Sequence, residues 1–306
     1  MDDRGPPLAA YAALLGTTTA FGFSFVATKF ALRGFEPLLI ALLRFSLAGA
    51  ILFLLWRLRG GRERLSRREL ARLAALGFVS LTVYFTFENL GIARTSASDA
   101  AILIGAIPIF VSVLNVFTLH ERNSGAQWTG ILLSFAGVVA LIELGARGAG
   151  GSTLLGNLLV LGASLAAAVY NVAARRLLVT RSALFVTTFQ NLFGALFMLP
   201  LAVAEALLVG VRSPTAQATG AVAYLVLACS VCGYLLLNYG LRFIEASKAS
   251  VFINLTPVVA VAAAYVLLGE RFTAGQLVAA VVVVAGVWLA NRGGRVLPAA
   301  EAPPLG

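Results

Sequence analysis

The chain has 306 residues, of which 60% are hydrophobic and only 12% are charged. Soluble domains carry roughly 25% charged residues, so this composition excludes a water-soluble fold and predicts an all-α integral membrane protein. The net charge of +10 is explained by membrane topology, and we expect no nucleic-acid partner.

Apolar runs of about 20 residues, the length that a transmembrane helix needs, follow one another closely along the chain. Ten such spans are predicted, at residues 8–32, 38–56, 72–93, 98–119, 125–144, 153–174, 184–210, 217–241, 247–268 and 273–291. Little chain remains outside the lipid for a soluble catalytic domain. Met1–Pro7 carries two Asp and one Arg, unlike the basic start of a cleaved signal peptide, so we expect the first span to be retained.

Lys and Arg are distributed unequally between the two sides of the membrane. If successive spans alternate in direction, sixteen of the 23 Lys and Arg residues fall on the side of the N-terminus and five on the other. Lys29 and Arg44 lie within spans. The positive-inside rule therefore predicts that both termini are cytoplasmic.

The second half of the chain repeats the first at a constant offset of 149 residues. Asn89, Gly91, Ala97, Ser98, Ala100, Pro108, Leu119, Glu121, Arg122, Gln127 and Gly137 recur as Asn238, Gly240, Ala246, Ser247, Ala249, Pro257, Leu268, Glu270, Arg271, Gln276 and Gly286. A weaker match at an offset of 146 pairs Lys29 with Arg175 and Arg44 with Gln190.

A repeat of this kind is typical of secondary transporters. Five spans in each half is an odd number, so the second half must cross the membrane with the opposite polarity. We predict two inverted five-helix repeats, residues 8–145 and 153–293, joined by Gly145–Thr153 and enclosing a central cavity.

These repeated tracts resemble the two EamA-type repeats of the drug/metabolite transporter superfamily. Residues 21–29 resemble the first helix of that family, with Phe21 where Trp is common. The resemblance covers residues 8–293. It implies a ten-helix carrier of the bacterial inner membrane with cytoplasmic termini and a central cavity built by inner helices of both halves. Within the superfamily the chain looks most like the amino-acid exporters, including the exporters of aromatic amino acids.

Several repeated residues have a structural interpretation. Ser124–Gln127 and Thr273–Gln276 both read S/T-x-x-Q, the pattern of a capping box, and should open the fifth and tenth helices. The preceding pairs, Glu121-Arg122 and Glu270-Arg271, are interpreted mainly as interfacial anchors, with gating as the alternative.

Pro108 and Pro257 fall in the middle of the fourth and ninth spans. Each removes a helical hydrogen bond. They are either simple kinks or paired bends that shape the transport pathway.

Polar residues within the spans are costly in hydrocarbon and point to a binding site. The first half offers Lys29, Arg44 and Glu88, and the second half offers Tyr170, Asn171, Gln190, Tyr234 and Asn238. Lys29 could instead extend to the interface. Arg44 either pairs with Glu88 or attracts a substrate carboxylate, and Glu88 is also a candidate proton site.

Aromatic residues of the inner helices could form a pocket for a zwitterion with an apolar side chain. Leu81, Tyr84 and Glu88 share one stripe of the third span, and Tyr234 and Asn238 share a face of the eighth. The alternative is that these aromatic residues simply pack against helices and lipid. The full candidate set for the cavity is Phe25, Lys29, Arg44, Leu81, Tyr84, Glu88, Pro108, Tyr170, Asn171, Gln190, Tyr234, Asn238, Asn254 and Pro257.

Catalytic and cofactor signals are weak. Cys229 and Cys232 form a CxxC within an apolar helix, without a second pair and with a single His in the chain. Gly145–Thr153 lacks the G-K-[ST] ending of a phosphate loop. We therefore predict no metal, no cofactor and no enzymatic activity.

The sequence as a whole predicts a secondary transporter that exports neutral or aromatic amino acids by alternating access. The alternatives are a multidrug exporter, a passive channel and an intramembrane enzyme. A multidrug exporter is disfavoured because the interior is more basic than acidic, and an intramembrane enzyme because no catalytic set is visible. The expected partners are the small-molecule substrate and lipid. Gly130 and Gly137 could support helix contacts in a monomer or a weak homo-oligomer.

Overall fold

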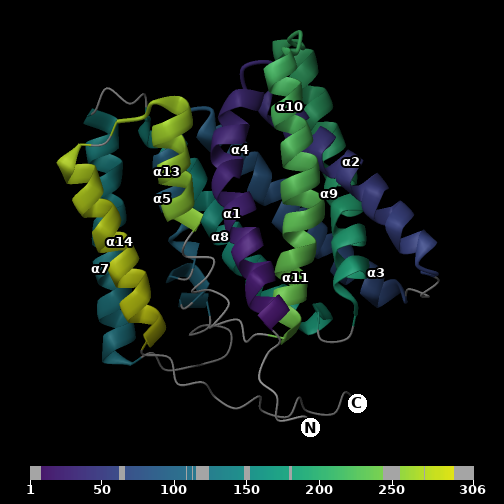
Figure 1. The fold of residues 1–306 in the computed structure, drawn as a ribbon, viewed down its shortest axis with the longest axis horizontal. Coiled ribbons are helices and arrows are strands. Elements are labelled where there is room, and N and C mark those ends of the chain that lie inside the picture. Colours follow the sequence, from purple (N-terminus) through teal and green to yellow (C-terminus); the bar gives the residue numbers. More distant parts are fainter. Residues whose placement is uncertain are drawn as a thin grey trace.

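The computed structural model describes residues 8–61, 66–107, 109–111, 113–114, 124–147, 152–178, 181–243, 256–271 and 273–292, without some side chains inside these ranges. The described residues form ten helical segments, and successive segments run in opposite directions (Figure 1). We call the end of the bundle at the top of Figure 1 the upper end, where the first segment finishes and the second begins. The opposite end is the lower end.

The first half of the chain contributes five of these segments. They are α1 (Leu8–Ala31), α2 (Pro37–Leu58), a continuous rod of α3 (Arg67–Gly77), η1 (Phe78–Val83) and α4 (Tyr84–Ile92), then α5 (Ala97–Ile104) and α7 (Gly125–Arg147).

The second half repeats this order. It contains α8 (Leu154–Leu178), α9 (Ala183–Val209), a rod of α10 (Ala216–Tyr224), η2 (Leu225–Gly233) and α11 (Tyr234–Phe243), then α13 (Thr256–Leu268) and α14 (Ala274–Arg292). Because α1 rises and α8 descends in Figure 1, the second half is inverted relative to the first.

Most of the described helices are apolar enough for a bilayer. Five of them are also long enough to cross a bilayer: Leu8–Ala31, Pro37–Leu58, Arg67–Ile92, Ala183–Val209 and Ala216–Gly240. Shorter apolar helices cover Ala97–Val111, Leu154–Tyr170, Thr256–Leu268 and Ala274–Gly286. The prediction of an all-α membrane protein is confirmed.

Local sequence signals determine where several helices begin. The backbone N–H of Gln127 donates to Ser124 Oγ at 3.3 Å, and that of Ser124 donates to Gln127 Oε1 at 2.6 Å. Thr273 and Gln276 make the equivalent pair of bonds at 3.0 and 3.2 Å. Both predicted capping boxes are confirmed, and they lie at opposite ends of the bundle.

The third segment begins earlier than predicted. It starts at Arg67 rather than Arg72, because Ser66 and Glu69 form a further capping box. The first turn belongs to the helix, but its charged residues excluded it from the predicted apolar span.

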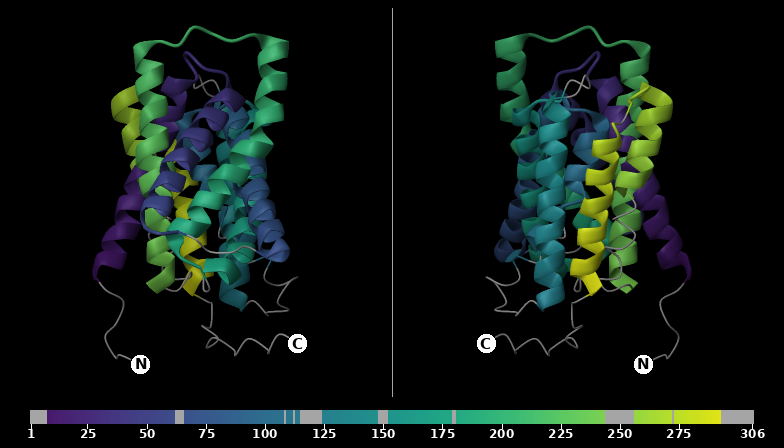
Figure 2. Two further views of the ribbon diagram at one scale, coloured as in Figure 1. Left: turned by 90° about the vertical axis from the view of Figure 1, so that its right-hand side faces the viewer. Right: turned by 90° about the vertical axis from the view of Figure 1, so that its left-hand side faces the viewer.

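The two halves interleave instead of forming separate bundles. Helix α1 packs on α10, α11 and α13, whereas α2 packs on α9. Helices α7 and α14 pack side by side at one edge of the molecule (Figure 2). Each of these contacts joins an element of one half to elements of the other.

Repeated glycines allow the close approach of α7 and α14. A methyl group on Gly137 would lie 2.9 Å from the Val283 backbone nitrogen, and one on Gly286 would lie 2.7 Å from the Gly130 carbonyl oxygen. Gly137 and Gly286 are equivalent in the repeat. The predicted helix contact of Gly130 and Gly137 is therefore made within the chain.

We predict that Gly137→Val lowers the free energy of unfolding by about 1–3 kcal/mol, because the added methyl groups overpack the interface with α14. Gly220→Val is the matched control, since a Cβ at Gly220 has no heavy atom within 4 Å. Thermal unfolding of both variants in detergent measures the difference. Equal stability of the two variants would contradict this packing.

Candidate functional site

Arg44 on α2 is a buried cation near the middle of the bundle. Its side chain is 3% exposed, and its Nε donates a hydrogen bond to Ser230 Oγ on η2 at 2.6 Å. The guanidinium carbon lies 4.5 Å from the ring centroid of Phe85 and 5.6 Å from that of Phe45. Cation–π contacts of this kind stabilise a cation away from water. The Arg44–Ser230 bond also links the two halves.

Glu88 on α4 has a different partner. It is 5% exposed, and its Oε1 accepts a hydrogen bond from the Tyr84 hydroxyl at 2.7 Å. The ion pairs found between described side chains join Arg181 to Glu69 and Arg212 to Glu36. Of the two alternatives for Arg44, a direct pair with Glu88 is therefore wrong, although the two side chains interact electrostatically at longer range.

Gln190 on α9 makes the counterpart of the Arg44 contact. Its Nε2 donates to Ser80 Oγ on η1 at 2.7 Å, while its Oε1 accepts from the Tyr170 hydroxyl at 3.2 Å. Arg44 and Gln190 match in the weaker part of the repeat. In each half, therefore, a side chain of the second span donates a hydrogen bond to a serine in the π-helical turn of the other half.

The two π-helical turns occupy equivalent places. Shifted by the repeat offset of 149, residues 78–83 become 227–232, which lie within η2. Such turns often mark functional sites in helices. Sequence reasoning missed Ser80 and Ser230. The available signal was a serine near the middle of the third span and another near the middle of the eighth.

Tyr234 packs in one cluster with Phe45 and Phe85, the rings beneath Arg44, and Tyr84 packs against the same cluster. At longer range Tyr234 interacts electrostatically with Arg44, Tyr170 and Glu88. Its ring lies 5.4 Å from that of Phe21, centroid to centroid. The structure thus brings together five of the candidate residues in one buried cluster, which we call the central cluster: Arg44, Tyr84, Glu88, Tyr170 and Tyr234.

Asn238 joins two helices of the second half through a hydrogen bond. Its Nδ2 donates to Thr187 Oγ1 on α9 at 2.7 Å, whereas the repeat-related Asn89 donates to the Pro37 carbonyl oxygen at 2.9 Å. Both asparagines tie the third span of their half to the second.

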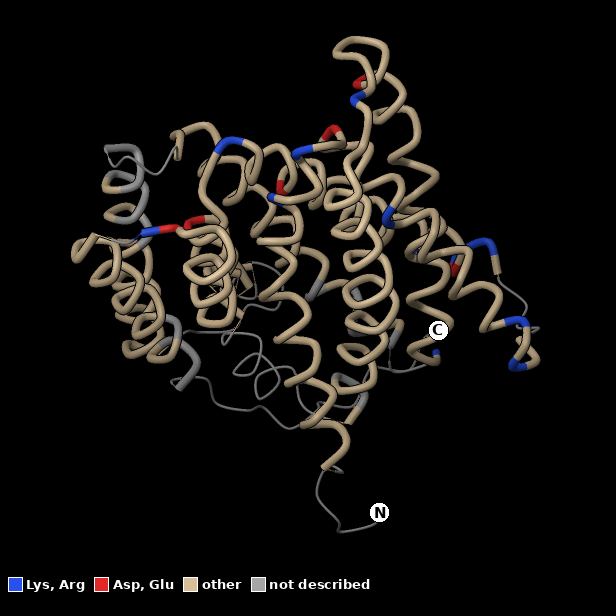
Figure 3. The backbone as a smooth tube through the Cα atoms, turned by 45° about the horizontal axis from the view of Figure 1, so that its top comes forward, with Lys and Arg blue, Asp and Glu red and all other residues tan. Residues whose placement is uncertain are grey.

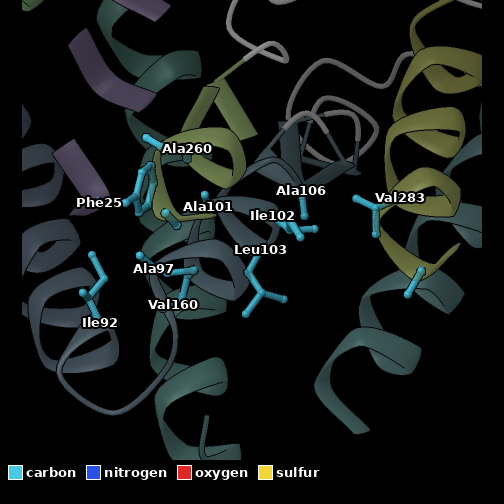
Figure 4. Packing of buried hydrophobic residues seen from close by; sticks show 14 of the residues in the cluster. Phe25, Ile92, Ala97, Ala101, Ile102, Leu103, Ala106, Val160, Ala260 and Val283 are labelled. Carbon is cyan, nitrogen blue, oxygen red and sulfur yellow. The ribbon is translucent and has the colours of Figure 1, made fainter. Parts of the chain in front are cut away.

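The remaining candidates lie beside or outside the central cluster. Phe25 packs in an apolar cluster with Ala101 and Ala260 (Figure 4). Leu81 packs beside the central cluster, in a second apolar cluster that contains Phe45, Phe85 and Tyr234. Pro108, Asn254 and the side chain of Asn171 lie outside the described residues.

Charged residues gather along the upper edge, which comes forward in Figure 3. There the Lys29 ammonium interacts electrostatically with the carboxylates of Glu270 and Asp99. Asp99 Oδ2 accepts a hydrogen bond from Ser152 Oγ at 2.5 Å. Lys29 therefore belongs to this upper group and not to the central cluster. Asp99 was missed because it sits at a predicted helix start, where an acid is usually a cap.

Among the described residues, no group of three or more His, Cys, Asp or Glu side chains could hold a metal ion. Cys229 is buried and Cys232 is exposed, and neither forms a disulfide.

Comparison with known proteins agrees with this architecture. The model of the EamA-like transporter family matches residues 8–142 and, separately, residues 154–292. The chain belongs to the EamA-like transporter family.

Relatives of this EamA-like transporter align along nearly its whole length. It is 31% identical to an uncharacterized transporter of Archaeoglobus fulgidus, over 90% of this chain and 96% of that protein. It is 28% identical to a probable terminal-alkyne amino-acid exporter of Streptantibioticus cattleyicolor, over 92% of each. A crystal structure with a TM-score of 0.65 and 22% identity covers 92% of this chain and 98% of the other, which shows a shared fold.

We predict that Ser230→Ala lowers the free energy of unfolding by about 1–3 kcal/mol, because it leaves the buried Arg44 Nε without its hydrogen-bond acceptor. Cys232→Ala, at an exposed position of the same π-helical turn, is the control and should be nearly neutral. Chemical or thermal unfolding in detergent micelles compares the two. A neutral Ser230→Ala would show that the bond contributes nothing.

Proposed function

We propose that this EamA-like transporter is a secondary transporter that exports neutral or aromatic amino acids, or closely similar metabolites, by alternating access. The observation that carries the proposal is the buried Arg44 guanidinium. Among the described residues only its Nε has a hydrogen-bond partner. A planar guanidinium with unused donors matches the geometry of a carboxylate, and a bound substrate carboxylate would offset the cost of a cation in the membrane interior.

Glu88 supplies the complementary charge. Its carboxylate lies in the same cluster, next to the Tyr84 hydroxyl. An amino acid carries a carboxylate and an ammonium group close together, so opposite charges on Arg44 and Glu88 suit a zwitterion. The rings of Phe21, Tyr84 and Tyr234 offer apolar contact for its side chain.

The repeat supports the mechanism. We take residues 8–145 and 153–293 as two inverted units, each of which contributes to the central cluster. Inverted units can exchange conformations, so that a midplane site opens alternately to either side. The Lys and Arg distribution supports a cytoplasmic lower end, and the similarity to a probable terminal-alkyne amino-acid exporter favours this substrate class.

A cationic-drug exporter is the main alternative within the family. It is disfavoured because Arg44 would repel a cation at the centre of the bundle. Glu88 gives only one compensating carboxylate, and Tyr84 already donates to it.

We predict that Arg44→Gln lowers kcat/KM for amino-acid counterflow in proteoliposomes roughly 10- to 150-fold, the effect of losing one charge-assisted interaction of about 1.5–3 kcal/mol. Arg57→Gln is the matched control, because Arg57 is an exposed cation at the lower end of the same helix. It should transport like the wild type.

The pattern across substrates separates the alternatives. Glu88→Gln should impair transport of zwitterions more than that of carboxylates without an amine. Wild-type protein that shows leak without counterflow would indicate a passive channel. Equal transport by Arg44→Gln and Arg57→Gln would remove Arg44 from the site.

A further inference from the structure

Glu270 makes a cluster of contacts that the central cluster does not explain. It lies between α13 and α14 at the upper end, in the second half. Its Oε1 accepts from the backbone N–H of Ala97 at 3.0 Å, and its Oε2 accepts from the N–H and hydroxyl of Ser98 at 3.2 and 2.5 Å. One carboxylate of the second half thus caps the first turn of α5, a helix of the first half.

The chemistry of this cap is favourable. A helix leaves its first N–H groups unpaired and carries partial positive charge at its N-terminus. Ser96 Oγ accepts a hydrogen bond from the N–H of Asp99 at 2.9 Å. Glu270 accepts hydrogen bonds from the two N–H groups before it, those of Ala97 and Ser98. Lys29 adds electrostatic attraction to Glu270 from α1.

Below the cap, α5 and α13 meet through small residues. Ala97, Ala101 and Gly105 follow each other at helical spacing of four, so they share a face of the first half's helix. A methyl group on Gly105 would lie 3.0 Å from Cγ of Pro257, the second residue of α13. Ala101 and Ala260 are fully buried in the same apolar cluster (Figure 4). Small apolar residues allow two helices to approach closely and to separate without breaking further polar contacts.

The structure therefore assigns Glu270 a gating role, resting on the transport function proposed above. Its bonds to Ala97 and Ser98 hold the upper ends of α5 and α13 together and close the pathway on that side. Transport requires them to break once in each cycle, when the upper end of α13 leaves α5 about the contact of Pro257 with Gly105.

A second carboxylate provides a matched comparison. Glu205 on α9 accepts from the backbone N–H groups of Leu38 and Leu39 at 2.8 and 3.2 Å, and so caps α2 across the halves in the same way. Helices α2 and α9, however, also pack through large aromatic rings at the lower end, where Trp56 and Phe185 are 6.2 Å apart between ring centroids, whereas α5 and α13 meet through small residues. In this proposal the Glu205 cap therefore stays in place throughout the cycle.

The test measures how readily a buried thiol at the α5–α13 contact reacts. Ala101→Cys is introduced into a Cys229→Ala, Cys232→Ser background, and the protein in nanodiscs is treated with a charged methanethiosulfonate reagent. We expect Glu270→Gln to raise the labelling rate about tenfold, the effect of weakening one charge-assisted contact. Ser98→Ala should give a smaller rise, and Glu205→Gln should leave the rate unchanged.

Thermal unfolding of the same variants separates gating from general loosening, because Glu205→Gln and Glu270→Gln should lose similar stability. An unchanged labelling rate in Glu270→Gln, or an equal rise in Glu205→Gln, would overturn the gating role. The readout needs no substrate. A wild type that fails to transport amino acids would therefore refute the proposed function while leaving the labelling result valid.

Discussion

A membrane interior offers no water, so every buried polar group must find its partner within the protein. In this chain several of these partners lie in the opposite half. Arg44 reaches Ser230, Gln190 reaches Ser80, and Glu270 reaches Ala97 and Ser98. Further hydrogen bonds also cross between the halves, such as those from Thr82 to the Gly194 carbonyl oxygen and from Ser164 to the Leu103 carbonyl oxygen. Close apolar contacts fill the space between these polar points.

This distribution suits a protein that must rearrange. Apolar helix surfaces rich in Gly and Ala can shift against each other at little cost, while a charged cap is either made or lost. The π-helical turns add a local irregularity at equivalent places in both halves, and they contain the serines that accept hydrogen bonds from Arg44 and Gln190. In the mechanism that we propose, the central cluster and the upper cap belong to one arrangement, in which substrate binding and closure would both act across the boundary between the repeats.

Much of this architecture could be predicted because its signals are local in sequence. Apolar runs predicted most of the helices, and the S/T-x-x-Q patterns predicted the N-terminal caps of α7 and α14. The third helix start was misplaced because a charged capping box resembles a loop in hydropathy. Arg44 and Glu88 were identified from their cost in lipid. Tyr84 was placed on the same stripe as Glu88, but its hydrogen bond to Glu88 and the partner of Arg44, Ser230, were not predicted. Glu270 was interpreted as an interfacial anchor, since its contact with α5 depends on how distant helices pack.

The inverted arrangement of the two repeats is tested most directly by labelling repeat-related positions. Gly125 and Ala274 are separated by the repeat offset of 149, are both exposed, and begin α7 and α14. Each is changed to Cys in a background without Cys229 and Cys232 and treated with a membrane-impermeant maleimide on intact cells. Ala274→Cys should react from outside, and Gly125→Cys only after permeabilisation. Reaction of both from the same side would contradict the inverted arrangement.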